Sequence, residues 1–131
     1  MARLSPRRAG RGKLNGVRGS VSVEAVLVMP VFFAAVFGIM EASLWVYAST
    51  VAQAAAQDGV RAATVYRGST LQGVHTAETI LATRDCGRDW VVTTSAGGTV
   101  LTFTVTGRAP SVVPGLGLTV RQSASLPWEV R

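Results

Sequence analysis

A glycine and a carboxylate stand close together where a basic segment meets the longest apolar run of the chain. Gly19 follows Arg18, and Glu24 lies five residues after Gly19, at the start of the apolar run. A peptidase needs an extended, uncrowded peptide bond, and glycine allows one, so Gly19 is a candidate processing residue. A conventional secretory signal carries its cleavage site after the apolar region. Here cleavage would precede that region and would leave the apolar helix on the mature protein.

The net charge of +6 is concentrated in the first 19 residues. This leader holds six basic residues and no acid, whereas residues 20–131 hold seven arginines and seven carboxylates. Basic residues confined to a tail beside an apolar segment are typical of the cytoplasmic flank of a membrane helix, not of a nucleic-acid-binding face. We therefore expect no nucleic-acid partner, a cytoplasmic leader (residues 1–19) and an exported C-terminus. The alternative for Gly19 is an ordinary leader glycine, like Gly10, Gly12 and Gly16.

The apolar run predicts one membrane-spanning helix over residues 20–48. Residues 25–48 contain one charged residue, Glu41, and would form about 36 Å of helix at a rise of about 1.5 Å per residue. That length crosses a hydrocarbon core of about 30 Å if Glu41 lies near the far interface. Trp45 and Tyr47 fit an aromatic belt there. Alanines and valines at helical spacing extend the helix to residue 67, with Gly68 as its C-terminal cap. Residues 49–68 are thus an exported extension.

Residues 69–131 predict a small exported α+β head. Val74, Ala77, Ile80 and Leu81 suit a short second helix. The period then falls to two: residues 90–94 and 99–106 flank Gly97-Gly98, which favours a hairpin. In its second strand Leu101, Phe103 and Val105 share one face, and a third strand places Leu118, Val120, Ala124 and Leu126 together. So small a sheet is marginal alone, and it needs either a neighbouring subunit or cover from the extension, around Val51, Ala55 and Ala62.

Small residues recur along the predicted long helix at spacings of three and four. Such residues lie on one helix face, where they let helix backbones approach closely in a membrane. The alternative is the general abundance of alanine in this chain. The residues predicted to pack helices are Ala34, Gly38, Ala42, Ala52, Ala56, Gly59 and Ala63.

The remaining polar residues offer no catalytic constellation. The single histidine, His75, and the single cysteine, Cys86, cannot supply a conventional zinc site. A lone cysteine also excludes an intramolecular disulfide, which leaves a partly buried thiol or an intermolecular bridge. No nucleophile elbow or phosphate-binding glycine loop is present. We expect a protein that is not an enzyme and has no cofactor and no metal.

The segment from Arg18 to Ala63 resembles the TadE-like branch of the tight-adherence (Tad/Flp) pilus pseudopilins. The residues that carry the resemblance are Arg18 to Glu24, Val26-Leu27-Val28-Met29-Pro30, Gly38-Ile39-Met40-Glu41, Tyr47 and Ala54 to Ala63. The resemblance implies cleavage between Gly19 and Ser20 by a prepilin peptidase. Glu24 would then be the fifth mature residue. Mature pseudopilins normally begin with an apolar or aromatic residue, and Ser20 is a mild departure from that pattern.

The two acids of the long helix are candidate assembly residues. An ionised carboxylate at the edge of the hydrocarbon is costly unless it is paired. After cleavage the nearest cation for Glu24 would be the new amine of Ser20, in the same subunit or a neighbouring one. A hydrated interfacial carboxylate is the alternative. For Glu41 the alternatives are an arginine of another subunit and simple hydration.

We therefore expect a single-pass protein of the bacterial cytoplasmic membrane that takes part in assembling a Tad-type pilus or secretion filament. The resemblance implies as partners the prepilin peptidase, a polytopic assembly platform, a cytoplasmic ATPase acting through that platform, and sister pseudopilins. Homo- or hetero-oligomers would form through the N-terminal helix. Two alternatives stay open. One is a secreted binding protein cleaved after the small residues Ala52-Gln53-Ala54, and the other is an uncleaved anchor for a small interaction domain.

Overall fold

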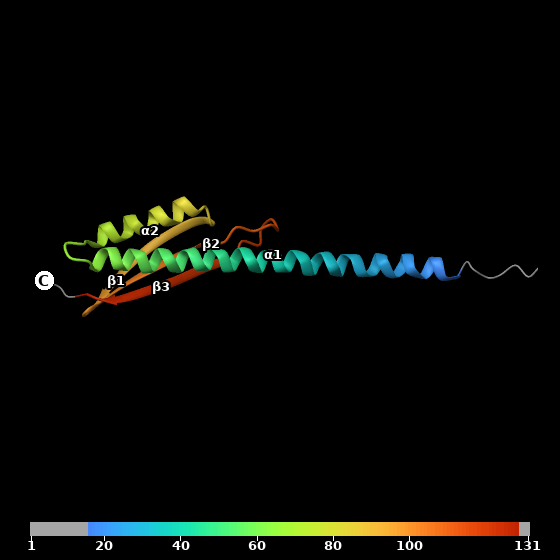
Figure 1. Cartoon of the computed structure of the whole chain (residues 1–131), viewed down its shortest axis with the longest axis horizontal. Helices are drawn as coiled ribbons and strands as arrows, with labels where there is room; N and C mark the ends of the chain where they lie inside the picture. Colours follow the sequence, from blue (N-terminus) through green and yellow to red (C-terminus); the bar gives the residue numbers. More distant parts are fainter. Residues whose placement is uncertain (1–15, 129–131) are drawn as a thin grey trace, which may run out of the picture. The chain divides into compact units, whose positions relative to one another are not determined.

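The computed structural model describes residues 16–128 of the chain, with side chains from residue 22 onward. Two helices are followed by three antiparallel strands (Figure 1). The predicted fold class, a long apolar helix with a small α+β head, is confirmed. Most of the predicted leader lies outside the described residues. The chain divides into two units, Met1–Val36 and Phe37–Arg131, and each is described by itself.

Helix α1 runs from Gly16 to Thr64 and continues through Pro30. By length and composition its segment from Ser22 to Thr64 is able to cross a membrane. Its side chains from residue 22 to residue 40 are exposed apart from the partly exposed Val36, although they are mostly apolar. A surface of this kind suits lipid, because a helix that is apolar on all sides has no face that favours water.

The C-terminal end of α1 differs from the sequence prediction. The helix ends at Thr64 rather than at residue 67, and Arg67 has a left-handed φ of 63°. The Gly68 amide donates to the Val65 carbonyl over 2.7 Å. A Cβ at position 68 would lie 2.5 Å from the Ala62 carbonyl oxygen. Gly68 is therefore required by a close backbone approach in the turn and does not act as the predicted cap.

Helix α2 spans Thr70–Arg84 and confirms the predicted second helix. Ser69 caps its N-terminus, because its side chain accepts a hydrogen bond from the Gln72 amide over 3.2 Å. Asp85 ends the helix in the left-handed region, with φ 44°. Capping at both ends fixes the start and the direction of this short helix.

Strands β1 (Arg88–Gly97), β2 (Val100–Arg108) and β3 (Thr119–Pro127) form a sheet in the order β1-β2-β3. Gly97 pairs with Val100, so the predicted hairpin closes with a two-residue loop. Gly98, at the first loop position, has φ 61°, a conformation that glycine adopts without strain. Leu118 lies outside β3 and is exposed, so its predicted place on the buried face of the third strand is wrong.

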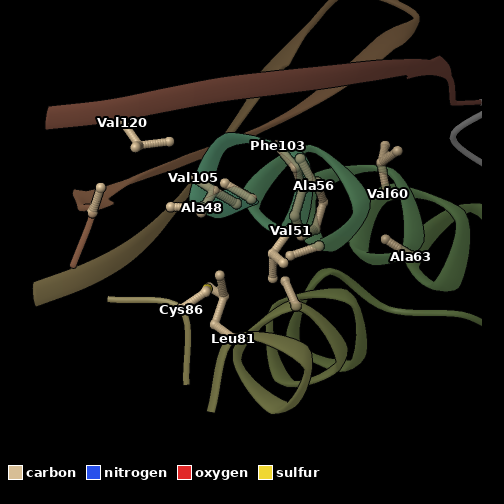
Figure 2. Packing of buried hydrophobic residues seen from close by; sticks show 14 of the residues in the cluster. Ala48, Val51, Ala56, Val60, Ala63, Leu81, Cys86, Phe103, Val105 and Val120 are labelled. Atoms are coloured by element: carbon tan, nitrogen blue, oxygen red, sulfur yellow. The ribbon is translucent and has the colours of Figure 1, made fainter. Parts of the chain in front are cut away.

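The core lies between one face of the sheet and the two helices (Figure 2). Leu101, Phe103 and Val105 are buried as predicted, and the threonines between them are partly exposed. Val51 and Ala55 of α1 belong to the same buried cluster, whereas Ala62 is only partly buried. The C-terminal part of α1 therefore covers the apolar face that so small a sheet cannot bury alone.

Candidate assembly site

The predicted processing residues lie in the first turn of α1. The helix begins at Gly16 rather than at the predicted residue 20, so the backbone of Arg18, Gly19 and Ser20 is helical. The first four amides of a helix have no acceptor within the helix. Two of the first four residues are glycines, which weaken a helix by about 1 kcal/mol each relative to alanine. This turn is thus easier to unwind than a turn in the interior of α1.

Glu24 lies on the exposed surface of α1. Its neighbours Val23 and Val26 are also exposed, at 62% and 70%. Within the described part of the chain no ion pair reaches Glu24, since the single one found there joins Asp58 and Arg61 over 3.6 Å. Its pairing with an amine of Ser20 therefore stays a prediction.

Glu41 is buried in the head and accepts hydrogen bonds from the connection between β2 and β3. The residue is only 7% exposed. One oxygen, Oε1, accepts hydrogen bonds from Ser111 Oγ over 2.6 Å and from the Val113 amide over 2.7 Å. The sequence analysis expected hydration or an arginine of another subunit, and both alternatives stay predictions beside these two contacts. Only the fold brings Ser111 to a carboxylate 70 residues earlier in the chain.

The predicted small-residue face is exposed along one part of α1 and buried along another. Ala34, Gly38 and Ala42 are exposed, and a Cβ at Gly38 would have no neighbour within 4 Å. Further along α1 the small residues are buried inside the head of the same chain, at Ala52, Ala56, Gly59 and Ala63. The first group stays available for packing against another helix, whereas the second is already used.

Two glycines, Gly59 and Gly73, lie where α1 and α2 pack closely together. A Cβ on Gly73 would lie 2.5 Å from the Gly59 carbonyl oxygen and 2.7 Å from Phe103 Cζ. A Cβ on Gly59 would lie 3.0 Å from the Gly73 carbonyl oxygen and 3.1 Å from Phe103 Cδ1. The Phe103 ring therefore fills the space beneath the helix crossing. Sequence analysis named Gly59 but missed Gly73, because an isolated glycine in a helical pattern gives no sign of its neighbour.

The other residues singled out in the sequence differ in their burial and in their hydrogen bonds. Trp45 is 39% exposed, and its Nε1 donates to the Thr119 carbonyl over 3.3 Å, so it also ties the head to α1. Tyr47 and His75 are exposed. Cys86 is buried as a free thiol, and burial raises its pKa. Among the described residues, no group of three or more His, Cys, Asp or Glu side chains is placed to hold a metal ion.

Residues 19–61 match the family model described as TadE-like protein. The matched segment begins at Gly19 and covers most of α1, including Glu24 and Glu41. No curated protein and no solved structure matches the chain. The head beyond α1 thus lies outside the matched segment. Residues 19–61 are therefore similar to the TadE-like family, and this similarity is consistent with a TadE-like protein of the Tad pilus system.

Proposed function

We propose that this chain is a structural, non-catalytic component of a Tad-type pilus or secretion filament, matured by a prepilin peptidase between Gly19 and Ser20. The observation that carries the proposal is the first residue of the family match. The match begins at Gly19, so the basic leader before it stands apart from the shared segment. Removal of residues 1–19 would leave residues 20–61 of that segment, including the apolar helix, on the mature protein.

The backbone at the proposed cleavage site supports this assignment. The bond between Gly19 and Ser20 lies in the first turn of α1, which the missing amide acceptors and two glycines weaken. A peptidase at the cytoplasmic face of the membrane would unwind this turn to bind the bond in an extended form. The basic leader favours the cytoplasmic side for the N-terminus, which leaves the head exported.

Assembly would depend on the exposed part of α1. Ala34, Gly38 and Ala42 offer a face along which another apolar helix can approach closely. Glu24 would pair with the new amine of Ser20, in its own subunit or in a neighbour, and so set the register between subunits. The partners in this proposal are sister pseudopilins and the assembly platform, with the ATPase acting through that platform.

The core weighs against the secreted alternative. Cleavage after Ala54 would remove Ala48, Val51 and Ala52 from the head, and all three are buried in its core. A soluble product that began at Ala55 would expose the side chains that these residues cover. The head therefore depends on the helix that a conventional signal peptidase would cut away.

The N-terminus of the protein isolated from membranes tests the proposal. We expect it to be Ser20, and we expect Gly19→Leu to leave the precursor uncut because its side chain crowds the bond. Gly16→Leu, which places the same side chain three residues earlier, is the matched control and should be processed normally. An N-terminus at Ala55, or an uncut wild-type chain in cells with an active prepilin peptidase, contradicts the proposal.

A further inference from the structure

The connection between β2 and β3, from Ala109 to Leu118, is an uncharged apolar loop on the surface of the head. None of its ten residues carries a charge. The loop is closed at its base by a hydrogen bond of 2.9 Å from the Ala109 amide to the Leu118 carbonyl. Four of its large apolar side chains are 39–48% exposed, namely Val112, Val113, Leu116 and Leu118. An apolar surface gathered on one loop indicates contact with a partner or a membrane.

Hydrogen bonds hold this loop beside the apolar part of α1. Glu41 accepts from Ser111 and Val113, and Trp45 donates to the Thr119 carbonyl just after the loop. Figure 1 shows the connection between β2 and β3 lying beside α1. Residues 41 and 45 lie in the run predicted to cross the membrane. The head therefore contacts α1 inside the segment that the sequence assigned to the membrane span.

Three arginines gather at the end of the sheet from which the loop emerges. Arg88 on β1 pairs directly with Arg108 on β2, and Arg121 on β3 is one diagonal step from Arg108. All three are exposed. Like charges on directly opposite strand positions destabilise a sheet, and no carboxylate forms an ion pair with them within the described residues. Phosphate groups are suitable counter-ions, because they accept paired hydrogen bonds from guanidinium groups.

We propose that the loop Ala109–Leu118 and the arginines 88, 108 and 121 form a docking surface for an anionic phospholipid bilayer. The apolar loop enters the boundary between headgroups and acyl chains, and the arginines bind lipid phosphates. Apolar side chains next to basic residues are the usual means by which interfacial segments bind membranes. Lipid is favoured over a second protein copy because the same loop is bonded to a helix that is long and apolar enough to cross a bilayer.

Spin-label depth measurements on the full chain test this docking surface. A nitroxide is attached at Val113→Cys or Leu116→Cys, in a Cys86→Ala background, and the protein is reconstituted in vesicles. The matched control is Ser95→Cys, whose partner Thr102 lies six residues along β2 from Arg108, about 20 Å from the loop end of the sheet. If Cys86→Ala fails to fold, the native Cys86 is kept, since it is buried and labels slowly.

We expect loop labels to relax faster with lipid-soluble oxygen than with a water-soluble nickel complex, and we expect the reverse at Ser95. Equal access of the nickel complex at all three sites would overturn the proposal. Concentration-dependent spin–spin broadening at the loop without oxygen access would also overturn it, and would assign the surface to a second copy of the chain.

Lipid composition tests the part played by the arginines. In vesicles with phosphatidylglycerol the loop labels should show at least a twofold higher ratio of oxygen to nickel accessibility than in phosphatidylcholine alone. Combining Arg108→Gln with Arg121→Gln should abolish that difference. Arg67→Gln, which removes an exposed arginine in the turn after α1, should keep it. A difference that persists without Arg108 and Arg121 would refute their binding to phosphate.

Discussion

Replacing Gly73 by alanine tests the close crossing of α1 and α2. Two effects of opposite sign act at this position. Alanine is better than glycine in a helix by about 1 kcal/mol. The added methyl group, however, would lie 2.5 Å from the Gly59 carbonyl oxygen and 2.9 Å from Ala63 Cβ. Overpacking of this kind costs about 1–3 kcal/mol.

The geometry places Gly73→Ala at the upper end of that cost. The nearest atom belongs to the backbone of α1, which cannot turn aside as the end of a flexible side chain can. A net destabilisation of about 1–2 kcal/mol follows from the difference between overpacking and helix propensity. In a unit of this size that corresponds to a fall in Tm of about 5–15 °C. At Gly59 the contacts are longer, 3.0–3.1 Å, so Gly59→Ala should change the Tm much less.

Thermal unfolding of the full chain in detergent, followed by near-ultraviolet circular dichroism, measures this series. The matched control is Gly97→Ala, because a Cβ there meets nothing within 4 Å and the residue has no positive φ. We expect Gly73→Ala to melt well below both Gly59→Ala and Gly97→Ala. If Gly73→Ala melts at or above Gly97→Ala, helix propensity outweighs packing and the described crossing of the helices is incorrect.

Three further predictions concern individual polar groups. Ser111→Ala removes a donor from the buried Glu41 carboxylate and should lower the Tm more than Ser123→Ala on the exposed face of β3; equal melting would show that the contact contributes little. Iodoacetamide should modify Cys86 at pH 8 only at the rate at which the head opens, because the thiol is buried and burial also raises its pKa. Since the folded pKa is raised, the thiol favours the folded state below its ordinary pKa of about 8.5, and that contribution is lost as the pH rises through the folded pKa. Stability should therefore fall above pH 9 more steeply in the wild type than in Cys86→Ala, and rapid modification of folded protein would contradict the burial. Glu24→Gln should allow membrane insertion and processing but reduce incorporation into the assembly, as measured by crosslinking of subunits; wild-type crosslinking would leave the carboxylate as a merely interfacial group.

Much of the fold follows from local patterns that need no tertiary information. The alternation of Leu101, Phe103 and Val105 with threonines predicts a strand with one buried face, and Gly97-Gly98 predicts its hairpin. The structure bears out both. The end of α1 was predicted less well. Glycine is common at helix C-caps, so the sequence predicts Gly68 as the cap, whereas the helix ends at Thr64. The actual role of Gly68 depends on a carbonyl at Ala62 that approaches only when the turn has formed.

The sequence by itself determined the apolar helix, the charge of its leader, the order of the elements and the match of residues 19–61 to the TadE-like family. Hydrophobic periodicity, charge distribution and turn residues are local properties, so the chain displays them without folding. Only the tertiary structure decided which groups donate hydrogen bonds to Glu41 and which small residues remain exposed. The first depends on residues 70 positions apart along the chain, and the second on contacts such as the one between Gly59 and Gly73. The partner of a buried polar group and the neighbours of a small side chain come from distant parts of the chain, so the adjacent residues in the sequence do not predict them.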